Sequence, residues 1–225
     1  MNGVEELILI GASGLAREVI GSLGHSRAQR VIGVLDDDPH SRTGTYGGVP
    51  VIGSLLELNR FPRAHILVCV GSGAVRERIV ACLDLPTERY ATVVDPSVRN
   101  PADCPVGVGS ILLANVTITA DATVGRHVVM MPSVTVTHDD SVDDFATLAA
   151  GVSLGGAVTV GRAAYLGMNS SVHPGVVLGI YSTLGMGAVL LRDLPDRETW
   201  AGVPAGPLRG NYLAHPVESI AEAAT

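Results

Sequence analysis

Apolar residues recur at every sixth position through the second half of the chain. The series begins at Val106 and runs to Leu190 without an insertion or a deletion. A period of six fits neither an α-helix, which repeats about every 3.6 residues, nor an isolated strand, which repeats about every 2. It fits a unit of one short strand and one tight turn, three of which close a triangular coil.

Stacking such coils predicts a left-handed parallel β-helix of hexapeptide repeats. In each repeat we expect the periodic apolar residue to point into the prism. A small residue usually follows four places later, as at Ser110 and Ala122, and we expect it to let the corner turn. Asp140 stands at one of these small-residue positions. A local break in a regular pattern indicates a place where function is expected.

Residues 1–98 follow a different pattern, in which apolar runs alternate with helical spacing. The runs at 6–10, 31–35, 65–70 and 90–94 predict strands, the segments 15–23 and 74–83 predict helices, and Gly47, Gly48 and Pro50 mark a loop. Strands that alternate with helices are typical of a small Rossmann-like parallel sheet. We therefore expect an α/β domain at 1–98, the β-helix at 99–195 and a C-terminal tail at 196–225.

Composition and charge exclude several classes of function. The formal net charge of −7 disfavours non-specific binding to nucleic acid. All 15 basic residues are arginine, so chemistry that needs a lysine, such as a Schiff base, is excluded. No apolar run is long enough for a membrane helix, and the N-terminus lacks the features of a signal peptide. With three cysteines that lack metal-ligand spacing, the chain is expected to be cytoplasmic, with no nucleic-acid or membrane partner.

The turn Gly11-Ala12-Ser13-Gly14 lies between the first predicted strand and the first predicted helix. Glycines let a ligand approach the backbone, and the start of a helix offers N–H groups to a phosphate. Asp36 ends the next strand, where an acidic residue would meet a ribose hydroxyl. The spacing is GxxG rather than GxGxxG, so a tight strand–helix turn without a ligand is the alternative.

His138 lies inside the repeat array, two places after the inward Val136, so we expect it to face outward or to lie at a corner. An imidazole next to a carboxylate suits a general base, because it titrates near neutral pH and the acid orients it. A solvated surface histidine is the alternative. His127, His138 and His173 are the candidate ligands for a zinc site. His138 and His173 are about two coils apart, too far to share an ion within one chain, although a site between two chains stays open.

The two halves together resemble the sugar O-acyltransferase family, which includes sialic acid O-acetyltransferases and nucleotide-amino-sugar N-acetyltransferases of the bacillosamine type. The resemblance covers nearly the whole chain and rests on the hexad array and on GASGLAREVI at 11–20, LDDD at 35–38, VDPSV at 94–98, THDD at 137–140 and AGVPAGPLR at 201–209. It implies acetyl-CoA as a co-substrate, a nucleotide-linked sugar as the acceptor, direct transfer without an acyl-enzyme and no metal. It also implies a homotrimer with acetyl-CoA between neighbouring β-helices, and a nucleotide-sugar-binding role for the N-terminal domain.

The resemblance also assigns roles to single residues. His138 would be the general base, Asp139 the acid beside it, and Gly156 the backbone donor to the developing oxyanion. The residues implied at the coenzyme A site are Thr147, Met168, Gly185, Met186 and Pro204. Those implied at the sugar-nucleotide site are Ser13, Gly14, Leu15, Asp36, Asp37, Gly71 and Met131.

Three positions depart from the family pattern. Leu15 and Thr147 stand where family members commonly have histidine, and Met131 stands where many have an asparagine that touches the sugar. Methionine in place of asparagine removes a donor and an acceptor from the sugar pocket. These departures leave the identity of the sugar and of the acyl group open.

The sequence therefore predicts an acetyl-CoA-dependent N-acetyltransferase that acts on a nucleotide-linked amino sugar. Transfer to a hydroxyl of a sugar or another small molecule is the alternative, because an amine and a hydroxyl both need a base. A non-catalytic trimer that senses nucleotides and a hydratase with a bridging metal are the interpretations from other classes.

Overall fold

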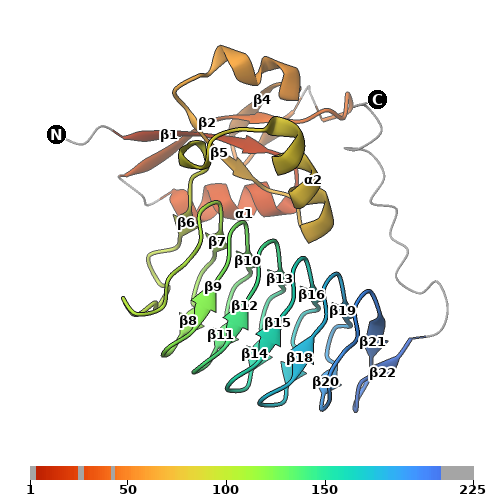
Figure 1. The fold of residues 1–225 in the computed structure, drawn as a ribbon. Helices are drawn as coiled ribbons and strands as arrows, with labels where there is room; N and C mark the ends of the chain where they lie inside the picture. Colours follow the sequence, from red (N-terminus) through yellow and green to blue (C-terminus); the bar gives the residue numbers. More distant parts are fainter. Residues whose placement is uncertain (1–3, 25–27, 42–43, 209–225) are drawn as a thin grey trace.

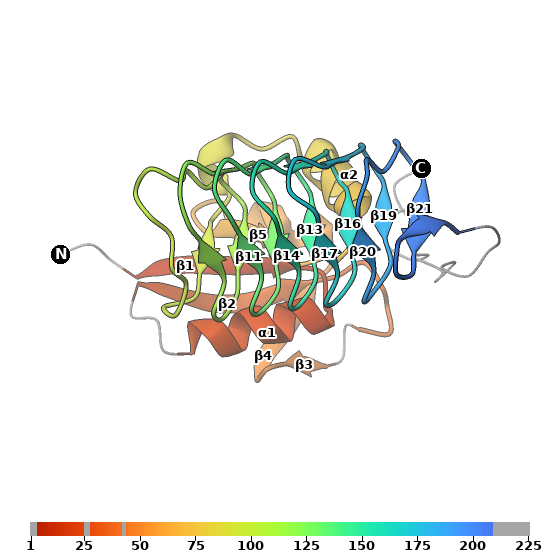
Figure 2. The ribbon, with the colours of Figure 1, turned by 90° about the horizontal axis from the view of Figure 1, so that it is seen from below.

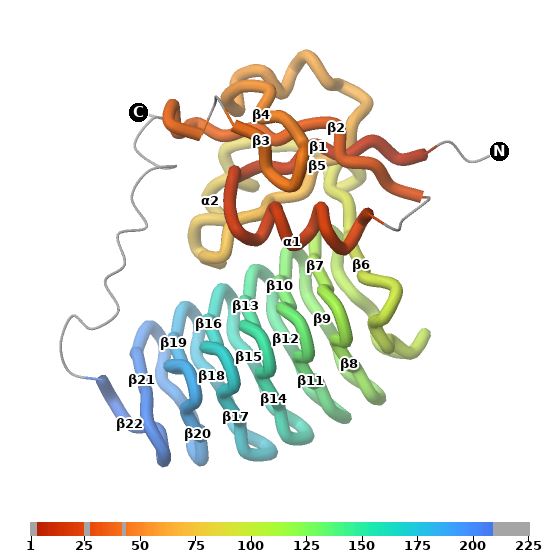
Figure 3. The backbone as a smooth tube through the Cα atoms, turned by 180° about the vertical axis from the view of Figure 1, so that it is seen from behind, coloured from red at the N-terminus to blue at the C-terminus, as the bar shows by residue number. Residues whose placement is uncertain are grey.

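The computed structural model describes residues 4–24, 28–41 and 44–208 (Figure 1). An α/β domain is followed by a left-handed parallel β-helix, and the domain lies along the side of the β-helix (Figures 1 and 2). Helix α1 lies between the α/β sheet and the first coils, as the view from behind also shows (Figure 3). The last part of the predicted tail, residues 209–225, lies outside the described residues.

The α/β domain is built on a five-stranded sheet with the order β3-β4-β2-β1-β5. All its neighbouring strands are parallel except β3 and β4. Its elements are β1 (Glu5–Ile10), α1 (Gly14–Leu23), β2 (Gln29–Leu35), β3 (Thr45–Tyr46), β4 (Val49–Gly53), the 3-10 helix η1 (Leu55–Arg60), β5 (His65–Val68), α2 (Gly73–Leu83) and the 3-10 helix η2 (Thr87–Arg89). The strands predicted at β1, β2 and β5 and the helices predicted at α1 and α2 are thus confirmed.

Two features of this domain differ from the sequence prediction. The expected loop around Gly47 and Gly48 is the tight turn of the β3–β4 hairpin, in which both glycines have positive φ. The fourth predicted strand is divided between two sheets: Tyr90 forms a parallel bridge with Ile66 of β5, whereas β6, at Val93–Val94, pairs with β7 of the β-helix. A short apolar run cannot specify which of two adjacent sheets it will join, so its sequence was compatible with either.

The β-helix has three sheets, which we call the first, second and third faces. Their strand orders are β22-β21-β19-β16-β13-β10-β7-β6, β20-β17-β14-β11-β8 and β18-β15-β12-β9. Partner residues in neighbouring coils are 18 positions apart, as Val129 opposite Thr147 shows. The strands are β7 (Ile111–Leu112), β8 (Thr117–Ile118), β9 (Thr123–Val124), β10 (Val129–Met130), β11 (Thr135–Val136), β12 (Ser141–Val142), β13 (Thr147–Leu148), β14 (Ser153–Leu154), β15 (Thr159–Val160), β16 (Tyr165–Leu166), β17 (Ser171–Val172), β18 (Val177–Leu178), β19 (Thr183–Leu184), β20 (Val189–Leu190), β21 (Thr199–Ala201) and β22 (Gly206–Pro207).

Two residues of each hexad point into the prism. The periodic apolar residues from Leu112 to Leu190 are all buried, as predicted. The small residues four places later are buried as well. The expectation that they form the corners is therefore wrong. The corner is the residue just before, which takes a left-handed backbone at every sixth position from Gly109 to Gly187. The second inward residue is small because it must share the narrow interior with the larger one.

The β-helix continues beyond the limit expected at residue 195. Strand β21 pairs with β19, but Thr199 lies 16 positions after its partner Thr183 rather than 18. Leu194 fills the interior in this shortened coil. The six-residue period is lost there, so the pattern alone could not follow the last coil.

A buried arginine fastens the α/β domain to the first face. The guanidinium of Arg76, on α2, is almost completely buried. It donates hydrogen bonds to the carbonyl oxygens of Val70, Gly71, His127, Phe145 and Ala146 and to the hydroxyl of Thr147. Burial lowers the pKa of Arg76 to about 9. Because these acceptors come from both domains, the side chain holds the domains in a fixed arrangement.

The next residue of α2 makes a second connection. The Glu77 carboxylate accepts hydrogen bonds from Arg162 at 2.8 Å and from the Tyr181 hydroxyl at 2.6 Å. Arg162 also reaches Asp144, one coil away, at 3.3 Å. Charge and hydrogen bonding thus tie the first turns of α2 to the edge between the third and first faces.

We predict that Arg76→Met destabilises the protein strongly. Methionine fills a similar length but donates nothing, so several buried carbonyls would lose their donor. An unsatisfied buried polar group costs about 1–3 kcal/mol, and we expect the free energy of unfolding to fall by about 3 kcal/mol or more in urea denaturation. Arg78→Met, at an exposed position of the same helix, is the control and should change it by less than about 0.5 kcal/mol. Equal effects of the two changes would show that the buried hydrogen bonds do not hold the domains.

Candidate active site

His138 lies on the edge where the second and third faces meet. Its turn, Thr137–Asp140, joins β11 to β12. Asp139 takes the left-handed corner with φ of 61°, a conformation that aspartate tolerates better than most residues. The side chains of His138 and Asp139 are 67% and 62% exposed, which confirms the predicted outward orientation.

The two side chains contact each other. The Asp139 Oδ2 lies 2.8 Å from the Nδ1 of His138. A carboxylate only accepts hydrogen bonds, so Nδ1 carries the proton and the lone pair of the neutral imidazole lies on Nε2. The hydrogen bond to Asp139 raises the pKa of His138, and the charges of Asp139 and Asp140 raise it further.

Gly156 stacks on His138 from the next coil. A Cβ at Gly156 would overlap Cε1 and Nε2 of the imidazole, so any larger residue at this position would have to displace the ring. The Ala157 N–H donates to the His138 carbonyl at 2.9 Å and aligns the two turns. The Gly156 N–H donates to no other residue of the described part of the chain. The basic nitrogen of the exposed imidazole and the N–H of Gly156, a buried residue stacked against the ring, therefore belong to adjacent groups at this edge.

The predicted nucleotide residues gather at one edge of the α/β sheet, because the carboxyl ends of β1, β2 and β5 meet there. Ser13 caps α1 by accepting from Ala16 N–H, and its hydroxyl donates to the Cys69 carbonyl at 2.6 Å. The buried Asp36 carboxylate accepts from Ala12 N–H at 2.6 Å and from Asp38 N–H at 2.8 Å. Ser13 and Asp36 thus brace the glycine turn.

The remaining residues implied for the sugar nucleotide lie in two settings. The Asp37 carboxylate accepts the Leu55 N–H at 2.9 Å. Gly14 and Gly71 are exposed, and a Cβ on either would meet nothing within 4 Å. Leu15 is buried in the apolar cluster between α1 and the first face, and Met131 packs against the same cluster. The two departures from the family pattern at these positions therefore belong to one apolar cluster.

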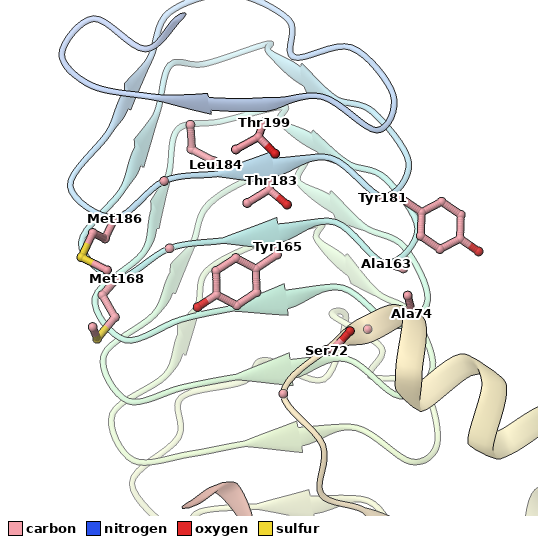
Figure 4. Close-up of a pocket in the computed structure, with 14 residues that line it drawn as sticks. Ser72, Ala74, Ala163, Tyr165, Met168, Tyr181, Thr183, Leu184, Met186 and Thr199 are labelled. Carbon is pink, nitrogen blue, oxygen red and sulfur yellow. The ribbon is translucent and has the colours of Figure 1, made fainter. Parts of the chain in front are cut away.

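A groove with a volume of ≈ 540 Å³ runs between the start of α2 and the outer side of the first face (Figure 4). Tyr165, Thr183 and Thr199, from β16, β19 and β21, form its floor. Gly71 and the first turn of α2 form one wall, and Tyr181 lines the same side. Figure 4 shows Met168 and Met186 on the opposite rim.

Three of the residues implied for coenzyme A line this groove: Met168, Gly185 and Met186. The two methionines are 48% and 70% exposed. Thr147 is buried one coil before the floor residue Tyr165, and its hydroxyl donates to the Gly71 carbonyl at 2.8 Å. Thr147 therefore does not line the groove but holds the backbone of Gly71, which does. Pro204 is exposed after β21 and is not among the groove residues.

A single chain does not bring His138 to this groove. The groove lies on the first face, whereas His138 lies on the edge between the second and third faces. In a triangular prism that edge is opposite the first face. The residues implied for the base and for coenzyme A therefore point away from each other within one protomer.

Sequence reasoning missed residues that build the groove. Arg76 gave a signal, because it shares a helical spacing with the apolar Ile79 and Leu83, where a charged residue is out of place. Tyr165 and Tyr181 gave a weaker one, since bulky aromatic side chains are rare in this array of small aliphatic residues. Neither signal reveals that α2 and the late coils share one groove.

The histidines considered for a metal lie in different surroundings. His127 is buried between Tyr90 and Phe145, and burial, with Arg76 as a second cause, lowers its pKa to about 4. His138 and His173 are exposed. In the described part of the chain, no three histidine, cysteine, aspartate or glutamate side chains come together as a metal site would require. No helix among residues 4–24, 28–41 and 44–208 combines the length and the apolar character needed to span a bilayer.

Comparison with known proteins gives one family match and many similar structures. Residues 6–83 match the PglD N-terminal domain. A histidine-to-asparagine mutant of perosamine N-acetyltransferase from Caulobacter crescentus, in complex with CoA and GDP-perosamine, is 29% identical, with a TM-score of 0.84 over 92% of this chain and 98% of that one. No curated protein sequence matches the chain.

A second structure agrees with the first. The acetyltransferase domain of PglB from Neisseria gonorrhoeae, in complex with acetyl coenzyme A, is also 29% identical, with a TM-score of 0.83 over 92% of this chain and 100% of that one. These similarities extend over both the α/β domain and the β-helix. Together with the match to the PglD N-terminal domain, they show that the chain is similar to sugar acyltransferases in both of its domains.

Proposed function

We propose that this protein transfers an acetyl group from acetyl-CoA to the amine of a nucleotide-linked amino sugar. The observation that carries the proposal is the placement of the His138 imidazole against Gly156, with Nδ1 held by Asp139. Similarity across 92% of the chain to an N-acetyltransferase in complex with CoA and GDP-perosamine supports the same chemistry.

In the proposed reaction the acceptor amine attacks the thioester carbonyl directly, and coenzyme A leaves as the thiol. The neutral imidazole of His138 accepts the proton of the attacking amine at Nε2. Asp139 keeps the proton on Nδ1 and stabilises the imidazolium that forms. The N–H of Gly156 donates to the oxygen on which negative charge develops.

The two substrates would occupy different parts of the chain. We assign coenzyme A to the groove beside Met168, Gly185 and Met186, whose volume is in the range of about 300–1,000 Å³ typical of small-molecule sites. We assign the sugar nucleotide to the glycine turn at Ser13 and the adjoining exposed backbone. Gly71 adjoins both, because it follows β5 at the edge of the sheet and also lines the groove.

We further propose a homotrimer in which one active site is shared by two protomers. His138 and the groove lie on opposite sides of one β-helix, so a complete site needs the base of one copy beside the groove of another. Exposed Met168, Met186 and Leu191 on the outside of the prism would be covered in such an assembly.

The proposed function predicts release of coenzyme A thiol only when a suitable amino sugar is present. We would screen UDP-, dTDP- and GDP-linked amino sugars with acetyl-CoA. His138→Ala should lower kcat by about 10²–10⁴-fold, the usual effect of a positioned base. His173→Ala, an exposed histidine about two coils away, is the control and should keep wild-type turnover. Near-normal turnover of the His138 variant would exclude it as the base.

Because the Asp139 carboxylate contacts the His138 imidazole, we can predict the direction in which its removal shifts the pH dependence of kcat/KM. The base works only when neutral, so kcat/KM should rise as the pH passes through the pKa of His138. Asp139→Asn keeps the shape but removes the charge that favours the imidazolium, so this pKa must fall. The acid limb of the profile should move to lower pH. The plateau should also drop, because a less basic imidazole accepts the proton less readily.

Both changes are required together in this pH profile. A lower plateau with an unmoved acid limb would mean that Asp139 only positions groups, or that the limb reports the substrate amine. The pKa of His138 measured by NMR in the free protein separates these two cases, because it does not involve the substrate.

The shared site predicts complementation between two inactive variants. Light scattering should give about 70 kDa for three copies of the 23.2 kDa chain. His138→Ala lacks the base, and Thr183→Trp should block the groove floor. Trimers reassembled from an equal mixture should recover about a quarter of wild-type activity, because one interface in four combines an intact base with an intact groove. A stable monomer, or no recovery in mixed trimers, would contradict the shared site.

A further inference from the structure

Asp140 is a carboxylate buried inside the β-helix. It occupies the second inward position of its hexad, which holds valine, alanine or serine in every other repeat from Ser110 to Ala188. Its side chain is only 1% exposed. Burying a carboxylate costs free energy unless hydrogen bonds compensate, so this exception to the pattern needs a physical reason.

The Asp140 carboxylate connects two turns that belong to different coils. Its Oδ2 accepts the N–H of Thr137 at 2.6 Å, and its Oδ1 accepts the N–H of Val158 at 2.8 Å. Thr137 begins the turn that carries His138, and Val158 follows the turn that carries Gly156. One side chain therefore joins the backbone of the proposed base to the backbone of the proposed oxyanion donor.

This connection replaces a hydrogen bond that other coils make locally. The N–H groups of Ala164 and Val176, which correspond to that of Val158, donate to Gly161 and His173 carbonyls within their own turns. The Val158 N–H instead donates across the coil boundary to Asp140. The Gly156 turn is thus fastened to the His138 turn rather than closed on itself.

The chain contains a neutral version of the same connection. Ser110 holds the equivalent inward position five hexads earlier, at the edge between the third and first faces, where its Oγ accepts the N–H of Val128 at 3.0 Å. Its hydroxyl donates to the Gly125 carbonyl at 3.0 Å. Serine at this position can therefore make the cross-coil hydrogen bond without a charge, and the fold accepts it.

We propose that Asp140 is a positioning residue of the acetyl transfer, whose carboxylate fixes the His138 turn against the Gly156 turn through Thr137 and Val158. This inference rests on the proposed function. Asp140 is too deeply buried to touch a substrate, so it acts only through the two turns. The distance from the imidazole Nε2 to the Gly156 N–H would depend on it.

Three variants test the proposal. Asp140→Ala restores the small residue found at this position in other coils, so the protein should still fold. Its kcat should fall about 10- to 100-fold, the effect of misplacing a catalytic group by about 1 Å, while KM for acetyl-CoA stays within about twofold. Asp140→Ser restores the Val158 hydrogen bond and should recover most of the lost kcat. Ser110→Ala removes the matched connection far from His138 and should keep wild-type kcat.

Several outcomes would overturn the proposal. A kcat of the Asp140→Ala variant within twofold of wild type would leave Asp140 with a structural role alone. An Asp140→Ser variant as slow as Asp140→Ala would show that the negative charge matters rather than the position. An equal loss in Ser110→Ala would point to a general effect on the β-helix.

A structural measurement separates failure of this proposal from failure of the proposed function. Crystal structures of the wild type and of Asp140→Ala should show the imidazole displaced from Gly156 in the variant and restored in Asp140→Ser. If the wild type acetylates no nucleotide-linked amino sugar, the proposed function fails, while a displaced imidazole still supports Asp140 as the residue that sets this geometry. An imidazole that stays against Gly156 in Asp140→Ala overturns the positioning role.

Discussion

The fixed register of 18 residues between stacked coils is the constraint on which the rest of this structure depends. Neighbouring coils are hydrogen-bonded on all three faces, so residues one period apart form columns that cannot slide independently. This register places Gly156 directly on His138 and Val158 on Asp140. One inserted residue within a coil would move every later residue to another column. The chemistry of the outer edges therefore depends on the regularity of the apolar interior.

The α/β domain uses the first face in two ways. Along the early coils it covers the face, where Ile111 and Val129 are buried in a shared apolar cluster with Leu15. Along the late coils the face stays open, and the column that continues through Tyr165 and Thr183 becomes the floor of the groove. Arg76 lies where covered and open parts meet, and it holds the carbonyls of both domains in place. The position of the groove follows from where this domain stops covering the β-helix.

The β-helix could be predicted from the sequence because it is periodic, whereas the way the α/β domain packs against it could not. Fifteen evenly spaced apolar residues from Val106 to Leu190 specify the β-helix, because only a coil of short strands buries such a series. The outward His138 follows from the same count. The placement of α2 beside β16 depends on the buried hydrogen bonds of Arg76, which no local pattern encodes. The last coil could not be predicted for a different reason. Its strand pairs with the preceding coil at a spacing of 16 residues, so the six-residue period ends although the fold continues.

The apolar replacements at Leu15 and Met131 gain a physical explanation from this arrangement. Both residues contribute to the apolar cluster between α1 and the first face, so a polar side chain at either position would be placed among apolar neighbours. The pair is therefore better understood as one change in the packing of the domain junction than as two separate losses of polar contacts. The glycine turn, by contrast, keeps its bracing by Ser13 and Asp36. The departures from the family pattern thus lie where the domains pack together, and the backbone that would meet a nucleotide is still held in place.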